Sequence, residues 1–363
     1  MPRQHGFRVY WGLLPLSFLY WIAIKLRNRC FDKGIFHSYV IPFPAICIGN
    51  LTVGGTGKTP HTEYLIRLLQ KSRRVTVFSR GYKRKSKEGL IASPDMTVYD
   101  IGDEPWQMKH KFPETEIYVC KQRAAAIQSA LQRPPGQRPQ VGILDDAFQH
   151  RQVKAGLNIL LTDYNRQIYD DKLLPAGRLR EPFSGRLRAQ IIIVTKCPDQ
   201  LTDKEQHDII RKLQPAKGQK VFFTHQRYSG LKAVFPCADK RQIALSQLPA
   251  IPSILIITGI ATPHLLKRDF ARFYPNAVML SYGDHHNFTK DDQESINRHF
   301  AQIRQDGSII VTTEKDAARF QQCTYLDKAV KAALYALPIE IEFLDKQGTT
   351  FDHIINDYVR TDQ

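Results

Sequence analysis

The sequence predicts an α/β protein, in which a parallel sheet covered by helices on both faces is followed by a second, smaller α/β domain. Two observations lead to this prediction. Short apolar runs alternate with helix-like stretches from residue 45 onward, as in chains that build parallel sheets. The 363 residues are also enough for two compact domains, each with its own apolar core.

The predicted strands are nearly continuous in apolar residues, which indicates burial on both faces. In the first domain they are 45–48, 75–78, 117–119, 141–144, 158–161 and 191–194. In the second they are 254–257 and 308–311, with a helix at 291–305 between them. Residues 339–343 alternate like a half-exposed strand, and we expect them to pair with 221–223 as a two-stranded connector, after which the last helix returns to the first domain. The predicted units are 1–35, 36–225 with the return 338–363, and 226–337.

The N-terminal segment 9–24 holds no charged residue and is rich in aromatic and aliphatic side chains. At about sixteen residues it is shorter than the roughly twenty that a spanning helix needs. Pro15 is expected to kink it, so the prediction is a membrane-associated helix that inserts shallowly. A secretory signal peptide and a buried core helix are the alternatives. The cations that flank the segment and suit anionic headgroups are Arg3, Arg8, Lys25, Arg27 and Arg29.

The overall charge favours polyanionic partners. Fifty-two Lys and Arg residues against thirty-five Asp and Glu residues leave a formal charge of +17. Nucleic acid, an anionic membrane surface and phosphorylated substrates all fit this charge, and a solvated basic surface is the alternative. The six cysteines are scattered without a Cys-x-x-Cys pair, which predicts no zinc or redox centre and suits a reducing, cytosol-facing location.

A glycine-rich loop follows the first predicted strand and leads into a helical stretch at 63–70. In such loops backbone N–H groups surround phosphates, a lysine reaches the β- and γ-oxygens, and the next hydroxyl ligates Mg²⁺. The strict G-x-x-x-x-G-K-[ST] pattern is broken where Thr52 replaces the first glycine, so a glycine-rich turn with an incidental lysine is the alternative. The predicted phosphate-binding residues, which make the first domain P-loop NTPase-like, are Thr52, Gly54, Gly55, Thr56, Gly57, Lys58 and Thr59.

Two adjacent carboxylates follow the predicted strand 141–144. Ligands bind at the carboxyl edge of open α/β sheets, and an apolar strand that ends in an aspartate commonly supports Mg²⁺ in P-loop enzymes. Asp145 and Asp146 are therefore predicted to hold the metal together with Thr59. A helix N-cap role for Asp146 is the alternative.

Seven motifs, in order along nearly the whole chain, resemble those of the tetraacyldisaccharide 4′-kinases, the lipid A 4′-kinases of Gram-negative bacteria. Thr52, which departs from the general loop pattern, is normal for this family. The motifs are residues 49–60, Ser79-Arg80-Gly81-Tyr82, Gly102-Asp103-Glu104-Pro105, Asp145-Asp146-Ala147-Phe148-Gln149-His150-Arg151, Arg180-Glu181-Pro182, Asp284-His285-His286 and Thr312-Thr313-Glu314-Lys315-Asp316.

The resemblance implies transfer of the γ-phosphate of ATP to the 4′-hydroxyl of a tetraacylated glucosamine disaccharide 1-phosphate, which forms lipid IVA. It implies ATP and Mg²⁺ as cofactors, and the lipid A precursor and the anionic inner-membrane surface as partners. The expected location is the cytoplasmic face of the inner membrane. No nucleic-acid partner is expected, and the chain is expected to be a monomer.

The resemblance also implies roles for individual residues. Asp103 and His285 form an acid–base pair for the substrate hydroxyl, with Lys58 as a further catalytic residue. Closure of the second domain is expected to bring the pair together. Which of the two contacts the hydroxyl is left open, and His286 is the adjacent alternative to His285. The implied substrate or phosphate contacts are Arg80, Arg123 and His150, and Glu104 is implied at or behind the metal.

Two other classes of protein share some of these features. Residues 195–199 read Thr-Lys-Cys-Pro-Asp and are similar to the guanine-reading pattern of GTPases, although one residue too long, so a membrane-targeted P-loop GTPase switch is the alternative function. A nucleic-acid-binding ATPase would fit the positive charge. However, the sequence contains no aromatic-rich RNA motif or helix-turn-helix.

Overall fold

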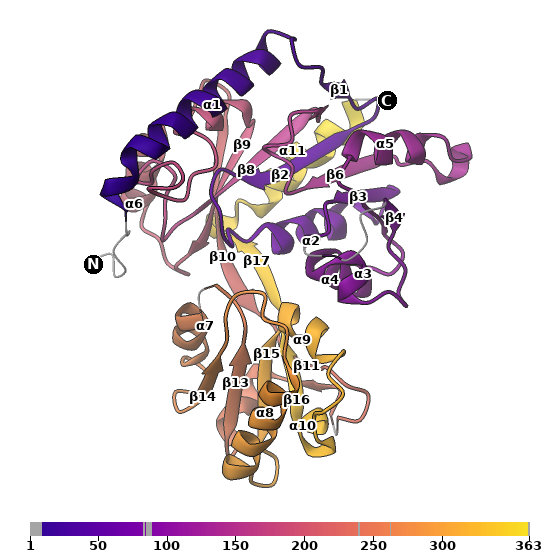
Figure 1. Ribbon diagram of the computed structural model, residues 1–363, viewed down its shortest axis with the longest axis vertical. Helices are drawn as coiled ribbons and strands as arrows, with labels where there is room; N and C mark the ends of the chain where they lie inside the picture. Colours follow the sequence, from indigo (N-terminus) through magenta and orange to yellow (C-terminus); the bar gives the residue numbers. More distant parts are fainter. Residues whose placement is uncertain (1–8, 83, 85–88, 239, 262, 362–363) are drawn as a thin grey trace.

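The computed structural model describes residues 9–82, 84, 89–238, 240–261 and 263–361. Two α/β units lie one above the other in Figure 1, and the long strands β10 and β17 run from the upper unit toward the lower one. The larger unit contains a nine-stranded sheet in the order β17-β10-β9-β8-β2-β6-β3-β5-β4, and the smaller unit contains a six-stranded sheet in the order β12-β11-β16-β15-β13-β14. The predicted α/β class is confirmed.

The larger sheet is parallel except at its two edges, where β17 and β4 are antiparallel to their neighbours. Its strands are β2 (Ala45–Asn50), β3 (Val75–Ser79), β4 (Leu90–Ile91), β5 (Glu116–Val119), β6 (Val141–Asp145), β8 (Leu157–Asp163), β9 (Ile191–Cys197), β10 (Lys220–Tyr228) and β17 (Ile339–Phe343). Its helices are α1 (Leu14–Asp32), α2 (Lys58–Leu69), α3 (Val98–Ile101), α4 (Asp103–Lys111), α5 (Arg123–Leu131), α6 (Asp203–Leu213) and α11 (Gly348–Thr361). A separate parallel pair joins β1 (Tyr39–Val40) to β7 (Val153–Lys154).

The smaller sheet is parallel in its centre and antiparallel where β11 meets β16 and β12. Its strands are β11 (Leu231–Ala233), β12 (Gln242–Ile243), β13 (Ile254–Thr258), β14 (Val278–Ser281), β15 (Ile309–Thr313) and β16 (Leu334–Leu337). Its helices are α7 (Pro263–Phe270), α8 (Lys290–Ile303), α9 (Glu314–Phe320) and α10 (Lys328–Ala333). The 3₁₀ turns among the described residues are η1 (Trp11–Leu13), η2 (Pro135–Gln137), η3 (Phe183–Arg188), η4 (Leu245–Ala250) and η5 (Leu344–Lys346).

Apolar helix faces cover both sides of the larger sheet. Residues of α2, α3, α4 and α11 pack on one face, while α5 and α6 pack on the other. Ile355 of α11 is fully buried in the first of these cores, although it comes from the end of the chain. Burial of one such side chain stabilises the fold by roughly 1.5–3 kcal/mol. The last helix of the chain therefore contributes to the core of the larger sheet.

The connector differs from the prediction in its register. Residues 339–343 pair with 224–228 rather than with 221–223. On its other side β10 pairs in parallel with β9, with a register shift between Phe223 and His225. Alternation of side chains predicts which face of a strand is buried but not its offset along the partner strand, because a shift by two residues keeps the same face.

Helix α1 lies across one side of the larger unit (Figure 1). The predicted kink at Pro15 is wrong: α1 begins at Leu14, so the proline occupies the first turn, where its missing N–H has no intrahelical partner to lose. The buried-core alternative is also wrong, since Ser17 is the only buried residue of α1. Among the residues that the structure describes, no helix has both the length and the apolar character needed to cross a bilayer.

Polar residues of α1 attach the helix to loops near the carboxyl edge of the sheet. The Tyr20 hydroxyl donates to the carbonyl of Arg180 at 2.9 Å, and Arg27 donates to the carbonyl of Gln149, also at 2.9 Å. Asn28 donates to the Glu181 carboxylate at 3.3 Å. The apolar side chains on the other side of α1 face outward, and the exposed ones are Leu16, Phe18, Leu19, Ile22 and Leu26.

Candidate active site

The phosphate-binding loop connects β2 to α2 at the carboxyl edge of the larger sheet. Gly57 precedes the helix with a φ of +83°, a left-handed conformation that glycine adopts without steric cost. Buried Thr56 accepts a hydrogen bond from the Asn50 amide at 2.8 Å, and its carbonyl accepts one from Thr195 at 2.9 Å. The protein itself therefore fixes the loop, which ends at a helix N-terminus that favours anions.

A second segment supports this loop from outside. The Val53 N–H donates to the carbonyl of Arg178 at 2.8 Å, and the Arg180 N–H donates to the carbonyl of Leu51 at 2.7 Å. Thr52 lies between these two bonds, is buried, and forms an isolated antiparallel bridge. An extended backbone suits a β-branched residue, which explains why a threonine is accommodated where the general pattern has glycine.

Strand β6 ends at the paired aspartates beside the loop. Asp145 is buried, and its carboxylate accepts hydrogen bonds from Thr62 at 3.2 Å and from Ser79 at 3.1 Å. Asp146 adopts a left-handed φ of +44°, and its carboxylate lies 3.8 Å from the Lys58 ammonium. The two neighbouring carboxylates therefore have different partners, and one of them faces the lysine of the phosphate loop.

Three carboxyl groups share this corner of the site. Burial and the charge of Asp146 raise the pKa of Asp145. Burial and the charge of Asp145 raise the pKa of Glu104, the second residue of α4, to about 7. Burial also opposes the ionisation of Asp146, but Lys58 and Arg180 outweigh it and lower the pKa of that carboxyl. Mutual repulsion of this kind favours a bound cation. Within the described residues, however, no group of three His, Cys, Asp or Glu side chains could hold a metal alone.

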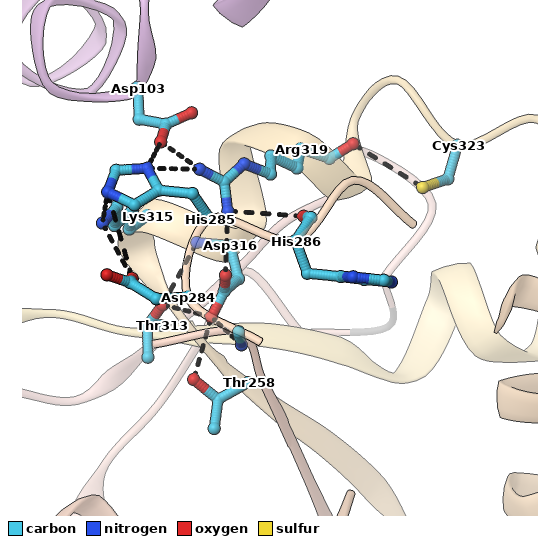
Figure 2. Close-up of polar contacts among 11 residues, drawn as sticks. Asp103, Thr258, Asp284, His285, His286, Thr313, Lys315, Asp316, Arg319 and Cys323 are labelled. Atoms are coloured by element: carbon cyan, nitrogen blue, oxygen red, sulfur yellow. Dashed lines mark hydrogen bonds and ion pairs between the residues drawn. The ribbon is translucent and has the colours of Figure 1, made fainter. Parts of the chain in front are cut away.

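Asp103 and His285 meet across the two domains (Figure 2), although 182 positions separate them in the sequence. His285 Nδ1 lies 2.9 Å from Asp103 Oδ2. Helix α4 begins at Asp103, and a helix N-terminus stabilises a carboxylate. Gly102 precedes it with a φ of +88°, and a Cβ at this position would lie only 2.9 Å from the carbonyl oxygen of Tyr82. The glycine therefore allows the close approach that places Asp103.

Helix α9 of the second domain brings two cations to this contact. Lys315 Nζ donates to His285 Nε2 at 2.9 Å, and the Arg319 guanidinium forms an ion pair with Asp103. Since Nε2 accepts from the ammonium, we assign the ring proton to Nδ1, which donates to Asp103. Burial opposes the ionisation of Asp103, but the hydrogen bond from His285 and the charges of Arg319 and Lys315 outweigh it and lower its pKa.

The three predicted substrate contacts lie in different environments. Arg123 is buried and donates to the backbone carbonyls of Asp145 at 2.7 Å and Asp146 at 3.3 Å, so it also shapes the aspartate turn. Its Nε is buried without a partner in the described part of the chain. Burial and nearby arginine charges lower the pKa of His150 to about 4, which keeps it neutral at pH 7. Arg80 is exposed.

The segment that is similar to a guanine-reading motif is occupied by contacts within the protein. Asp199 is bound by Arg272 at 2.6 Å and by His225 at 3.1 Å, both outside the loop region. Lys196 donates to Asp163 at 2.8 Å and also contacts the carbonyl of Gly55 in the phosphate loop. The carboxylate that would read guanine is therefore already engaged.

The fold and the shaped loop place this protein among the P-loop kinases. In the larger domain, a lysine and paired carboxylates lie at the carboxyl edge of the sheet. In the smaller domain, the His285 imidazole contacts the Asp103 carboxylate of α4. A site assembled from two domains is typical of enzymes that close around an acceptor and exclude water from it.

Comparison with known proteins narrows this class. The profile of the LpxK family, described as tetraacyldisaccharide-1-P 4′-kinase, matches residues 9–360. A tetraacyldisaccharide 4′-kinase of Bacteroides fragilis is 45% identical over 361 residues, which cover 99% of this chain and 95% of the relative. One from Phocaeicola vulgatus is 44% identical over 348 residues, which cover 96% and 94%. A crystal structure of LpxK from Aquifex aeolicus in complex with ATP aligns with a TM-score of 0.72 at 28% identity, covering 96% of this chain and 98% of that one. The chain belongs to the tetraacyldisaccharide 4′-kinase family, as its motifs predict.

Two residues of the site were assigned no role from the sequence. Lys315 lies within a motif that carries the family resemblance, and Arg319 lies just beyond it. Their spacing could have indicated that they act together, because residues four apart on a helix share one face. This helix directly follows the strand β15. The contact of that face with Asp103 depends on the packing of one domain against the other.

Proposed function

We propose that the protein transfers the γ-phosphate of ATP to the 4′-hydroxyl of a tetraacylated glucosamine disaccharide 1-phosphate, forming lipid IVA. The relatives reported above are named tetraacyldisaccharide 4′-kinases, after this reaction. The observation that supports it most within the structure is the 2.9 Å contact between Asp103 and His285. An acid–base pair near a phosphate loop suits transfer to a hydroxyl, from which a proton must be removed.

ATP is proposed to bind through residues 52–59, with Lys58 reaching the β- and γ-phosphates. The related structure from Aquifex aeolicus was determined in complex with ATP. A cavity of about 450 Å³ between the domains, lined in part by Tyr164, Lys196 and His225, suits the nucleoside. Lys196 links this cavity to the loop through its contact with Gly55. A larger cavity of about 560 Å³ lies at the amino-terminal edge of the sheet, where ligands of open α/β sheets do not bind.

Magnesium is proposed as the second cofactor, since hard oxygen donors are the groups it prefers. The raised pKa values of Asp145 and Glu104 fit a corner that a divalent cation would neutralise. We propose Thr59, Asp145, Asp146 and Glu104 as the residues that hold it, with the phosphates and water as its other ligands. When bound, the ion would supply charge neutralisation for the transferring phosphoryl group.

His285 and Asp103 are proposed to remove the proton. A carboxylate that accepts from Nδ1 fixes the tautomer and makes Nε2 the basic nitrogen of the ring. The hydroxyl proton passes to Nε2, the hydroxyl oxygen bonds to the γ-phosphorus, and the bond from the γ-phosphorus to the bridging oxygen breaks as ADP leaves. The unit 226–337, which carries His285, is proposed to close on the unit 36–225 with its return 338–363.

Three basic side chains are proposed to bind the substrate or its phosphates. His150 lies within the electrostatic influence of Arg123 and Arg80, and an anion would be attracted to such a group. The buried Nε of Arg123 is free to donate within the described part of the chain. The 1-phosphate of the disaccharide is the part of the substrate that these groups suit best.

The cytoplasmic face of the inner membrane is the proposed location, with α1 as the contact. The side chains of Leu19 and Leu26 are 61% and 62% exposed, and Trp11 at 67% adds an aromatic group at the end of this surface. A helix of this type lies in the interface, where it meets both acyl chains and anionic headgroups. The protein is proposed to act as a monomer, without nucleic acid.

The proposal is tested by incubating the purified full-length protein with γ-labelled ATP and the tetraacylated disaccharide 1-phosphate in detergent micelles. We expect label in a bisphosphorylated lipid. Unlabelled ATP should compete with the labelled nucleotide, and GTP should compete much less. Failure of the folded protein to label this lipid would contradict the proposed function, and preferential use of GTP would favour the GTPase switch.

A further inference from the structure

Two cations on one face of α9 flank a single imidazole ring. Lys315 lies 2.9 Å from Nε2 of His285, and Arg319 lies 3.1 Å from Nδ1 of the same ring (Figure 2). Their spacing of four residues places both on the same side of the helix. One helix of the second domain therefore contacts both nitrogens of the residue that the proposed function makes the base.

The imidazole is held rigidly between these groups. His285 has a left-handed φ of +57°, which is uncommon outside glycine, and its N–H donates to the carbonyl of Gly259 at 3.0 Å. A backbone in this region persists only where its surroundings impose it. The charged or titratable groups that face the ring are Asp103 on α4, Lys315 and Arg319 on α9, Asp284 beside it, and Tyr82, whose ring centre lies 5.5 Å away.

The Nε2 contact cannot persist through the reaction. A nitrogen lone pair that accepts from an ammonium cannot also accept the substrate proton, so Lys315 must leave Nε2 before His285 can act. Its alternative partner on the same side, Asp284, is 3.5 Å away and 42% exposed. The lysine stem has several rotatable bonds, so its ammonium can change partners while the helix stays in place.

We propose that Lys315 is a catalytic residue that leaves His285 Nε2 when ATP binds and then contacts the transferring phosphoryl group. The inference rests on the proposed function. It adds to the active site a second cation, which comes from the smaller domain rather than from the phosphate loop. Before this movement the same ammonium occupies the lone pair of the base. The phosphoryl group supplies the negative charge that draws it away.

Contacts at the start of α9 support the direction of this movement. Glu314, which precedes Lys315, and Glu63 of α2, the helix that begins at Lys58, both bind the Lys111 ammonium, at 2.9 and 2.7 Å. The start of α9 is therefore tied to the helix that follows the phosphate loop. Phosphoryl transfer spreads negative charge over three oxygens, and a cation on each side stabilises it.

Arg319 is fixed, in contrast to Lys315. Its side chain is 4% exposed, it pairs with Asp103, and it lies 3.6 Å from the fully buried Asp316. Asp316 in turn accepts hydrogen bonds from the Thr258 and Thr313 hydroxyls, at 2.9 and 2.8 Å, at the ends of β13 and β15. This chain of contacts ties Arg319 to the core of the second domain. Arg319 therefore holds α9 and Asp103 in place, while Lys315 is able to move.

The test compares Lys315→Met and Lys315→Arg in the full-length enzyme, with Lys290→Met as the control. Lys290 lies in the same domain, is 59% exposed, and contacts Glu294 and the Tyr325 ring, away from His285. For Lys315→Met we expect kcat to fall by at least about a hundredfold, the scale for loss of one charge-stabilising group. Calorimetry should give an ATP affinity within about threefold of the unsubstituted enzyme. Lys315→Arg, which keeps the charge, should recover at least about tenfold of the lost kcat.

A second readout separates a catalytic from a structural role. ADP with aluminium fluoride mimics the planar phosphoryl group, and its affinity should fall in Lys315→Met by about the same factor as kcat. Equal weakening of ATP and of this analogue, or a kcat within about threefold of normal, would overturn the proposal. If the unsubstituted enzyme fails to phosphorylate the lipid, the proposed function fails instead, so the two failures are distinguishable.

Discussion

The phosphate loop and the contact between Asp103 and His285 lie in one site but are built in different ways. The loop is held by backbone and side-chain bonds within the larger domain, such as those from Thr195 and Asn50 to Thr56. The acid–base contact joins side chains from two domains. A preformed loop can bind phosphate at any relative position of the domains, whereas the base is assembled only when they meet. We therefore expect substitutions at the acid–base contact to affect phosphoryl transfer much more than binding of the ATP phosphates.

A partly buried ionic bridge connects the two regions. Lys111 of α4 donates to Glu63 of α2 at 2.7 Å and to Glu314 of α9 at 2.9 Å. Gln107 adds a 2.8 Å hydrogen bond to Glu63. The three helices that carry Lys58, Asp103 and Lys315 are thus joined through one ammonium group. We interpret this bridge as the element that sets the domain position at which the acid–base contact forms.

Lys58→Ala should give the largest effect, because it removes the cation of the loop itself. We expect kcat to fall by at least about a hundredfold and ATP binding to weaken as well. Lys71→Ala, an exposed position just beyond α2, is the matched control. Steady-state phosphotransfer and calorimetry with ATP measure the two effects. Normal ATP affinity in Lys58→Ala would show that the loop does not bind phosphate through this lysine.

Asp103→Ala should impair the acid–base contact and leave the phosphate loop intact. We expect kcat to fall by at least about a hundredfold, while ATP affinity stays within about threefold, because the loop is held without the second domain. Asp95→Ala, an exposed carboxylate before α3, serves as the control. Near-normal turnover of purified Asp103→Ala would remove this carboxylate from the mechanism. A comparable loss of ATP affinity would contradict the separation of the two regions.

Lys111→Met should destabilise the protein by about 3 kcal/mol, because it leaves the buried Glu63 and the half-buried Glu314 without their cation. Burial raises the pKa of Glu63 to about 7, above its model-peptide value of 4.5. The stability linked to this group is therefore present below about pH 4.5 and is lost as the pH rises through about 7. Without Lys111, ionisation of Glu63 costs more stability. The destabilisation by Lys111→Met should therefore be greater at about pH 8 than at about pH 6.

Denaturant unfolding at both pH values measures this deficit. Glu63→Gln combined with Lys111→Met should recover part of the stability, since it removes one of the two facing charges. The same recovery in the double variant at both pH values would contradict the assignment of the titration to Glu63.

Substitution of two exposed leucines of α1 should give the smallest effect on catalysis. Leu19→Ser combined with Leu26→Ser should weaken binding to anionic vesicles by at least about tenfold, since each leucine contributes on the order of 1.5 kcal/mol when buried in lipid. ATP affinity and stability should not change, because neither side chain packs in the core. Full cosedimentation of the double variant with vesicles at high salt would exclude α1 as the membrane contact.

The two regions also differ in how far the sequence predicts them. The loop directly follows one strand and the paired aspartates lie at the end of another, so each obeys local rules and their positions in the sheet could be predicted. Asp103 and His285 were predicted as a pair only through the family resemblance, since no local pattern links residues so distant. The roles of Lys315 and Arg319 required the packing of α9 on α4. Local rules failed at Pro15, which lies in the first turn of α1, and in the register of β17 against β10, which side-chain alternation does not fix.

His285→Ala tests the central claim most directly, with ATP binding and phosphotransfer measured on the same preparation. The account predicts that calorimetry with magnesium and ATP gives an affinity within about threefold of the unsubstituted protein, while transfer to the lipid hydroxyl falls by at least about a hundredfold. Transfer at a near-normal rate would contradict the claim that the base is supplied across the two domains. Loss of ATP binding would contradict the claim that the phosphate loop is complete without it.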